Sequence, residues 1–212
     1  LKAYKNKLKG DLYTDKKTRL LYATDASVYR EIPRAVALPK DKDDIRELIT
    51  IAQKTKNSLI PRTAGTSLAG QVVGNGIVVD VSRYMTNIIE VNEKERWVRV
   101  QPGVILDELN LFLKDYELFF GPETSTANRC MIGGMVGNNA CGAHSILYGT
   151  TRHHTISVKG FLSDGSEVEF GPLSNEEFRE KLQGESVESK IYQRIHEILN
   201  NPDNQKEIEQ EY

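Results

Sequence analysis

The residue types best suited to bind a ligand gather in residues 120–149, a stretch of glycine, small polar and small apolar residues. Its six glycines are Gly121, Gly133, Gly134, Gly137, Gly142 and Gly149. Glycine has no Cβ, so its backbone can approach a flat or anionic group closely and can adopt a positive φ. Free backbone N–H groups that cluster in such a loop bind anions, more strongly where a helix begins just after it. The alternative is an ordinary glycine-rich turn that binds nothing.

Another loop of the same kind spans residues 61–76 and follows a short apolar run. In chain order, residues 61–76 are the first loop and residues 120–149 are the second loop. Residues 61–71 carry two glycines and the hydroxyl side chains of Thr66 and Ser67. They match neither GxxxxGK(S/T) nor GxGxxG, the patterns of two common nucleotide-binding loops. Alone, this loop would be interpreted as a turn rich in small residues. Because two such loops occur in one chain, a phosphate-binding role is the better interpretation of both.

Composition excludes several kinds of partner. The chain has 212 residues, a net charge of −2 and a pI near 6.2, so no bulk positive charge favours nucleic acid or an anionic membrane. No apolar run approaches the roughly 18 residues of a membrane span, and the basic first ten residues lack the apolar segment of a signal peptide. Cys130 and Cys141 do not make a disulfide framework, so we expect a cytoplasmic protein. Because the sequence starts at Leu1, we expect it to be a piece of a longer chain.

The predicted elements place the first loop at the end of a strand. Residues 35–38 and 58–61 are typical of short buried strands, and residues 41–56 between them are typical of a helix. The apolar stripe of this helix consists of Ile45, Leu48, Ile49 and Ala52. A strand, a helix and a strand in this order predict a small parallel βαβ unit, which leads directly into the loop at 61–76.

The rest of the chain alternates between short strands and helices. The predicted strands are 76–81, 88–91, 97–101, 155–162 and 167–170, and the predicted helical segments are 104–116 and 174–212. Strands 88–91 and 97–101 read as an antiparallel hairpin, in which Trp97 anchors a sheet face rather than stacking on a ligand. Ile191, Ile195, Ile198 and Leu199 form an apolar stripe near the end of the chain.

Other candidate sites are weaker. Cys130, Cys141 and His144 could be imagined as a zinc cluster, but their spacing matches no common pattern and a fourth ligand is not evident. We therefore expect no metal, and we expect Cys130 to be a small packed residue. His153 and His154 are adjacent, so their side chains diverge on any regular element, and we expect them at a turn or on the surface.

Six segments occur in an order that is specific to one protein family. They are PRTAGTSLAGQ, GIVVDVSR, WVRVQPGV, FGPETSTANRCMIGGMVGNNACG, LYGTTRHH and LSDGSEVEF. Over roughly residues 20–172 the chain resembles the FAD-binding domain of the vanillyl-alcohol oxidase and p-cresol methylhydroxylase superfamily. It is most similar to the D-2-hydroxyacid dehydrogenases, which include D-lactate dehydrogenase and the FAD subunit of glycolate oxidase. Within this branch it resembles the long members that continue into an iron–sulfur region.

The resemblance implies an α+β fold in which two subdomains hold an extended FAD between them. The FAD-binding domain would comprise residues 35–172. Its first subdomain, 35–81, would be a small parallel βαβ sheet, and its second, 82–172, a larger and mainly antiparallel sheet with helices. Residues 1–34 would form an N-terminal arm, and residues 173–212 a helical segment that leads to a cap domain beyond this sequence.

The resemblance also implies which residues contact FAD. In the first loop the backbone of Arg62, Thr63, Ala64, Gly65, Thr66 and Ser67 would surround the pyrophosphate, with Leu68 and Gln71 nearby. In the second loop Pro122, Glu123, Thr124 and Ser125 would lie towards the ribityl chain and ring, Gly133 and Gly134 along the pyrophosphate, and Asn138, Gly142 and Tyr148 close by. A dianionic pyrophosphate with no dedicated lysine needs many N–H donors, and two such loops supply them.

Three departures from the family pattern change what is expected. Ala64 replaces the first glycine of the usual Gly-Gly-Thr. Alanine fits at this position if its φ is negative. Thr66 stands where covalently flavinylated relatives carry histidine, so we expect non-covalent FAD. The family's later Gly-Ser-Glu-Gly-Thr segment and its substrate-capping domain are absent, so the catalytic residues stay unknown.

The activity that the resemblance implies is oxidation of a D-2-hydroxy acid of the D-lactate, glycolate or D-2-hydroxyglutarate class. A base would take the hydroxyl proton, and the α-hydrogen would leave as hydride to the flavin. Electrons would pass to an acceptor, with an iron–sulfur region of the full-length protein as the candidate. A flavin- or nucleotide-binding module without turnover, and a nicotinamide-fed reductase of the cell-wall precursor type, remain as alternatives. The Asp164-Gly165 turn and the LYGTTRHH segment favour the hydroxyacid branch over this reductase.

Overall fold

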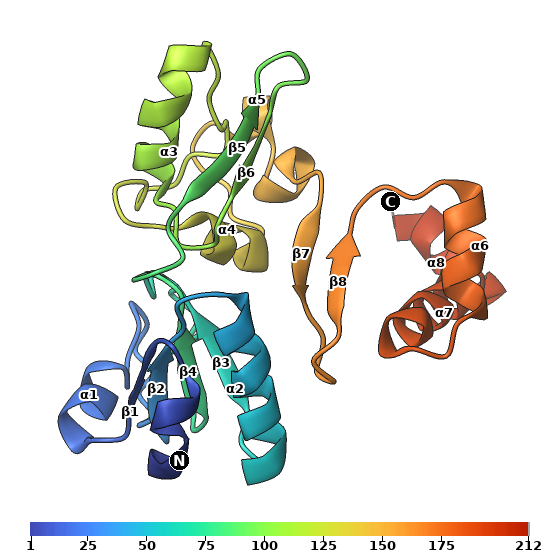
Figure 1. Ribbon diagram of the computed structural model, residues 1–212. Coiled ribbons are helices and arrows are strands. Elements are labelled where there is room, and N and C mark those ends of the chain that lie inside the picture. Colours follow the sequence, from blue (N-terminus) through green and yellow to red (C-terminus); the bar gives the residue numbers. More distant parts are fainter. Residues whose placement is uncertain (212) are drawn as a thin grey trace. The chain divides into compact units, whose positions relative to one another are not determined.

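A four-stranded sheet organises the first part of the chain (Figure 1). The computed structural model describes residues 1–211, and the chain divides into two compact units, Leu1–Thr155 and Ile156–Tyr212. The strand order in the sheet is β1-β2-β4-β3, and the strands are β1 (Asp11–Tyr13), β2 (Ala35–Leu38), β3 (Leu59–Arg62) and β4 (Ile77–Asp80). β2, β4 and β3 are parallel, which confirms the predicted parallel βαβ unit.

The first 34 residues do more than form an arm. They contain the 3-10 helix η1 (Lys2–Lys7), strand β1 and helix α1 (Lys16–Leu21), and β1 pairs antiparallel with β2. Leu8 and Leu12 are buried in the same core as Leu48 and Ile51. A strand of three residues has too short an apolar pattern to be recognised in the sequence, and burying its one leucine is what docks it.

Helix α2 (Lys42–Thr55) covers one face of this sheet (Figure 1). The Asp41 side chain caps it by accepting from the N–H groups of Asp43 and Asp44 at 3.0 and 3.2 Å. Leu48 and Ile51 are buried in the core beneath the sheet. Leu48 belongs to the predicted apolar stripe, whereas Ile51 was not included in it. β2 and β4 are buried along their whole length, which is typical of parallel strands with both faces covered.

The second half of Leu1–Thr155 is built around a hairpin and a separate apolar core. The hairpin pairs β5 (Ile88–Asn92) with β6 (Trp97–Val100). The other elements are α3 (Leu106–Leu113), η2 (Lys114–Tyr116), α4 (Ile132–Asn138), α5 (Ser145–Tyr148) and η3 (Thr151–His154). The core is formed by Val104, Leu106, Leu109, Leu113, Cys130, Ile132 and Met135. Trp97 is half-buried on the hairpin and donates from Nε1 to Glu95 at 2.8 Å, in agreement with its predicted place on a sheet face.

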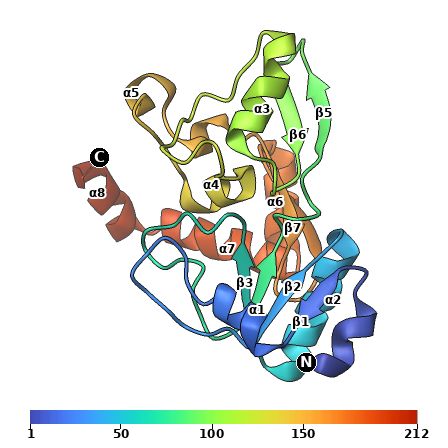
Figure 2. The ribbon, with the colours of Figure 1, turned by 90° about the vertical axis from the view of Figure 1, so that its left-hand side faces the viewer.

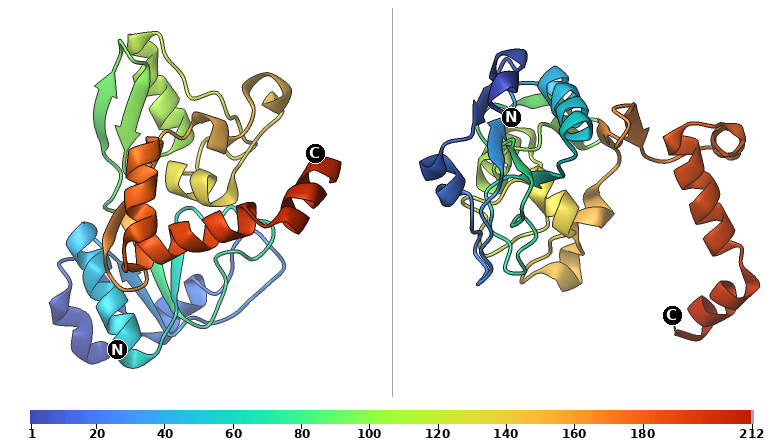
Figure 3. Two further views of the ribbon diagram at one scale, coloured as in Figure 1. Left: turned by 90° about the vertical axis from the view of Figure 1, so that its right-hand side faces the viewer. Right: turned by 90° about the horizontal axis from the view of Figure 1, so that it is seen from below.

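The second unit, Ile156–Tyr212, contains a second hairpin and three helices. The strands are β7 (Val158–Phe161) and β8 (Glu167–Phe170), with Gly165 in the turn at φ +86°. The helices are α6 (Asn175–Gln183), α7 (Val187–Leu199) and α8 (Pro202–Glu211). Helices α6 and α7 pack against each other, and the ring centroids of Phe178 and His196 are 5.6 Å apart. Helix α8 follows the end of α7 (Figure 3).

The antiparallel strands differ from the expected single larger sheet. They form two separate two-stranded sheets, β5-β6 and β7-β8, and the second of these clusters with the C-terminal helices. A turn signal predicts each hairpin locally but carries no information on whether two hairpins pair with one another. The apolar stripe at Ile191, Ile195, Ile198 and Leu199 is 38–52% exposed, so it is not buried by the described residues. Within residues 1–211, none of the helices combines the length and apolar character needed to cross a membrane.

Candidate functional site

The first glycine-rich loop leaves the carboxyl end of β3, where ligands bind in parallel α/β sheets. Gly65 and Gly70 adopt φ values of +67° and +73°, which only glycine adopts without strain. Ala64 is not among the residues with positive φ, which satisfies the condition for an alanine in this position. The loop runs beside the segment that follows α1 (Figure 2), and the N–H of Ala26 donates to the Gly65 carbonyl at 3.1 Å.

Six consecutive backbone N–H groups in this loop have no partner among the residues that the structure describes. Within the described chain, none of the N–H groups of residues 63–68 donates to a backbone or side-chain acceptor. Backbone donors in folded proteins are nearly always paired with protein, water or ligand. A row of six free donors on successive residues is therefore the arrangement expected of a loop that receives an anion.

Side chains of the first loop bond within the loop and to helix α4. Ser67 donates from its hydroxyl to the Gln71 side-chain oxygen. Gln71 in turn donates from Nε2 to the Asn138 side-chain oxygen at 3.0 Å, a contact 67 residues apart in sequence. The sequence-predicted Gln71 and Asn138 are thus brought together, and they join the first loop to the second. Leu68 is 81% exposed and touches neither core.

Helix α4, which lies in the second loop, separates the roles of its two adjacent glycines. The Gly133 N–H donates to the Pro102 carbonyl at 2.9 Å, and a Cβ at Gly133 would lie 2.5 Å from the Pro102 side chain. Gly134 has a free N–H among the described residues, and a Cβ there would lie 2.5 Å from the Thr63 hydroxyl. Gly133 therefore lets the helix sit against Pro102, and Gly134 lets it approach the first loop.

The other limb of the second loop folds back on itself. A Cβ at Gly142 would overlap the Glu123 carbonyl oxygen, and one at Gly121 would touch the Tyr148 ring at 3.1 Å. The Glu123 carboxylate bonds to Nδ1 of His144, which sequence analysis had considered only as a metal ligand. The N–H groups of residues 123–125 donate to no acceptor within the described chain. Gly142, predicted from resemblance to lie close to the cofactor, is thus in tight contact with the backbone at Glu123.

Glu123 and Tyr148 line a cavity of about 300 Å³ together with residues of α3. Its other lining residues are Leu106, Asp107, Asn110, Phe119, Phe120, Gly121, Ala127 and His144. Tyr148 packs edge-on against Phe119, with ring centroids 5.3 Å apart. Of the residues predicted to lie towards the ring, only Glu123 lines this cavity, and no residue of the first loop does.

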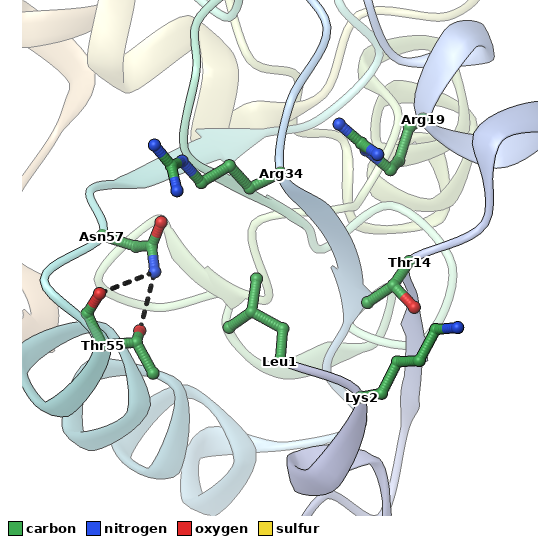
Figure 4. A pocket seen from close by; sticks show the side chains of 7 residues that line it. All are labelled: Leu1, Lys2, Thr14, Arg19, Arg34, Thr55 and Asn57. Atoms are coloured by element: carbon green, nitrogen blue, oxygen red, sulfur yellow. Dashed lines mark hydrogen bonds between the residues drawn. The ribbon is translucent and has the colours of Figure 1, made fainter.

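A larger cavity, about 410 Å³, is lined by no residue of either loop. Figure 4 shows its lining side chains. Two of its lining residues lie at the starts of parallel strands: Arg34 directly precedes β2, and Asn57 lies two residues before β3. The cavity is therefore at the amino ends of these strands, opposite the end from which the first loop leaves β3. The remaining lining residues are Leu1, Lys2, Thr14, Arg19 and Thr55. The cavity contains no predicted site residue and no carboxylate or histidine, so it offers no general acid or base at neutral pH.

The three residues considered for zinc have different partners. Cys130 is buried, with its Sγ 3.2 Å from the Thr124 hydroxyl and 3.7 Å from the Met135 sulfur, which confirms that it is a packed residue. Cys141 is exposed, and His144 bonds to Glu123. Residues 1–211 contain no group of three His, Cys, Asp or Glu side chains placed to hold a metal. His153 and His154 lie in η3 at the surface and bond to Thr150 and Tyr148 respectively, as expected for a turn.

One side chain beneath the first loop was missed from the sequence. The Arg62 guanidinium donates from Nη1 to the Thr24 carbonyl at 2.8 Å and lies over the Tyr22 ring, 5.2 Å from its centroid. The Tyr22 hydroxyl donates to the Asp80 carboxylate at 2.6 Å. Burial, and then the bond to Asp80, raises the pKa of the Tyr22 hydroxyl, so it stays a donor at neutral pH. Only Arg62's backbone was expected to matter, since nothing local in sequence points to Thr24, 38 residues away.

Comparison with known proteins identifies the family of this chain. Residues 33–171 match the family described as FAD binding domain. A D-2-hydroxyglutarate dehydrogenase of Haemophilus influenzae is 39% identical over 193 residues, 90% of this chain and 19% of that protein. Glycolate oxidase subunit GlcD of Bacillus subtilis is 32% identical over 155 residues, 72% of this chain and 33% of that protein. The chain thus spans only 19% and 33% of the length of these two curated relatives.

Among solved structures, Physcomitrella patens BBE-like 1 is similar in fold. Its TM-score is 0.71 at 17% sequence identity, over 82% of this chain and 38% of that chain. At this identity the similarity concerns the arrangement of helices and strands. The α+β fold class expected from the sequence is therefore confirmed.

Proposed function

The chain belongs to the FAD binding domain family, and from this premise we propose that its two glycine-rich loops hold the pyrophosphate of FAD between them. The observation that carries the proposal is the row of N–H groups at residues 63–68, which have no acceptor within the described chain. The N–H of Gly134 likewise has none there, and a Cβ on Gly134 would lie 2.5 Å from the Thr63 hydroxyl. A pyrophosphate has two negative charges and several acceptor oxygens, so it can satisfy such donors. The residues present therefore fit the group.

We propose the following division of roles. The first loop contacts the pyrophosphate through the backbone of Arg62, Thr63, Ala64, Gly65, Thr66 and Ser67, with Leu68 and Gln71 at its edge. In the second loop Gly134 contacts the same group, while Gly133 and Gly142 place the backbone, and Asn138 ties the loops together. Pro122, Glu123, Thr124 and Ser125 are assigned to the ribityl and ring end, with Tyr148 close by. The FAD-binding domain is proposed to extend over residues 35–172.

The first prediction is that the chain prefers FAD to FMN. FMN has a single phosphate, so it uses fewer of the free donors on the two loops. Purified chain is incubated with FAD or FMN, and the dissociation constants are measured by flavin fluorescence. We expect FAD to bind at least about tenfold more tightly, equivalent to about 1.4 kcal/mol. Equal or tighter binding of FMN would show that the loops do not hold a pyrophosphate.

The second prediction is that acid releases the flavin. Thr66 has a hydroxyl where covalent attachment needs an imidazole, and Cys130 is buried against Met135. Protein loaded with FAD is precipitated with acid and washed, and the absorbance of pellet and supernatant is measured. Flavin colour that remains in the washed pellet would contradict non-covalent binding.

At the level of the whole protein we propose a flavin-linked dehydrogenase of the CH–OH group of a D-2-hydroxy acid. The support is the similarity to D-2-hydroxyglutarate dehydrogenase and to glycolate oxidase subunit GlcD, over a part of their length. Bound FAD would accept the hydride that the hydroxy acid loses. The catalytic groups and an iron–sulfur electron acceptor are proposed to lie outside residues 1–212, with residues 173–212 leading to a cap domain. We also propose a cytoplasmic location and a small-molecule substrate, with no nucleic-acid partner.

A further inference from the structure

The first loop contains one cationic side chain, and it has no carboxylate partner. The guanidinium of Arg62 bonds to the Thr24 carbonyl and lies on the Tyr22 ring, and both are neutral groups. Nothing in the described chain forms an ion pair with it. The nearby carboxylate of Asp80 accepts instead from the Tyr22 hydroxyl at 2.6 Å and from the Ser82 N–H at 2.8 Å. The described residues therefore offer the Arg62 guanidinium no carboxylate within ion-pair distance.

This charge is held directly against the row of free donors. A Cβ built on Gly65 would overlap Nη2 of Arg62, so the guanidinium packs against the middle of the loop. The same loop residue is fixed from the other side, because its carbonyl accepts from the Ala26 N–H at 3.1 Å. Residues 22–26, which precede the part matched to the family, thus hold both the Arg62 side chain and the Gly65 backbone.

We propose that Arg62 is the positioning and charge-compensating residue of the pyrophosphate loop, held in place by the N-terminal segment 22–26. Its guanidinium holds Gly65 in its positive-φ conformation and supplies a positive potential beside the loop whose N–H groups at residues 63–68 have no acceptor in the described chain. A guanidinium of fixed orientation that forms no ion pair attracts an anion more strongly than one that is paired with a carboxylate. The inference rests on the proposed binding of FAD and adds a side-chain role to what was a backbone assignment.

A structural role alone would give a different result from an electrostatic one. If Arg62 only supported the loop, its replacement would weaken FAD and riboflavin alike, and the salt dependence of binding would not change. If it compensates the pyrophosphate, the loss would be specific to ligands that carry phosphate. The salt dependence would also fall, because screening acts on the charge that was removed.

The test compares Arg62→Gln, Arg62→Lys and a control, Arg83→Gln. Arg83 is a matched control because it lies over the Tyr84 ring at the same 5.2 Å but has Asp11 3.8 Å away and is not in either loop. Dissociation constants for FAD and riboflavin are measured at roughly 0.05 and 0.5 M salt, a range over which screening changes strongly. Circular dichroism of the flavin-free proteins checks that each variant is folded.

We expect Arg62→Gln to bind FAD roughly tenfold to a hundredfold more weakly, the range for loss of a charged partner, with a reduced salt effect. Arg62→Lys should recover part of the affinity, and Arg83→Gln should match the original protein. The inference would be overturned if salt weakened FAD binding equally in Arg62→Gln and in the original protein. It would also be overturned if Arg62→Gln left the affinity for FAD unchanged. Failure of the unmodified chain to bind FAD would instead contradict the proposed function itself.

Discussion

Gly142→Ala is expected to abolish FAD binding and to lower the free energy of unfolding by about 3 kcal/mol or more, as overpacking against backbone does. A Cβ at this position would overlap the Glu123 carbonyl oxygen, and neither backbone segment can rotate away as a flexible side chain could. The two limbs of the second loop would have to separate, which displaces the free N–H groups of residues 123–125. Urea unfolding and FAD titration measure the two effects.

Gly137→Ala is the matched control for this change. Gly137 lies in helix α4 and nothing is within 4 Å of a Cβ built on it. Because alanine has the higher helix propensity, we expect the free energy of unfolding to rise by about 0.5–1 kcal/mol, with FAD affinity unchanged. If Gly142→Ala behaved like Gly137→Ala, the close approach of residues 123 and 142 would not exist in solution.

Asp44→Ala is expected to destabilise the protein by about 3 kcal/mol or more, because it leaves several buried donors unpaired. The Asp44 carboxylate is 2% exposed and accepts from the backbone N–H groups of Lys9, Gly10 and Lys40, each at 2.8 Å. It therefore joins the N-terminal segment, the end of β2 and helix α2 at one point. Alanine removes all three bonds, and water reaches the freed N–H groups only if these elements separate.

Asp43→Ala gives the comparison for Asp44→Ala within the same helical turn. The Asp43 side chain is exposed and pairs with Lys9 at 2.8 Å. Exposed ion pairs contribute little, so we expect a loss below about 1 kcal/mol. Unfolding in urea is followed by circular dichroism for both variants. If both variants lost the same free energy of unfolding, the buried Asp44 carboxylate would contribute no more to stability than the exposed Asp43 carboxylate, and the prediction would be wrong.

The regular elements near the first loop could be predicted from the sequence because their signals are local. The buried runs at β2 and β4, the Asp41 cap of α2 and the turn glycines each act within a few residues. The glycine-rich loops were recognised for the same reason. The structure adds the observation that the N–H groups of residues 63–68 have no acceptor in the described chain. This could not be predicted from the sequence, because which backbone groups are paired depends on the folded conformation.

What the sequence could not predict depends on contacts between distant residues. β1 joins the sheet through a pairing with β2 more than twenty residues away. Gly133 and Gly134 look equivalent in sequence, yet one bonds to Pro102 and the other faces Thr63. The Arg62 side chain finds Thr24, and Glu123 finds His144, only after the chain has folded. Each of these is a tertiary contact that no local pattern encodes.

Amide hydrogen exchange of the chain with and without FAD tests the central claim most directly. If the two loops hold the pyrophosphate, FAD should slow exchange at residues 63–68 and at Gly134, because these N–H groups gain acceptors. Exchange around the cavity lined by Arg19 and Arg34 should stay unchanged. The account would be contradicted if FAD bound while residues 63–68 and Gly134 exchanged as fast as in the free protein.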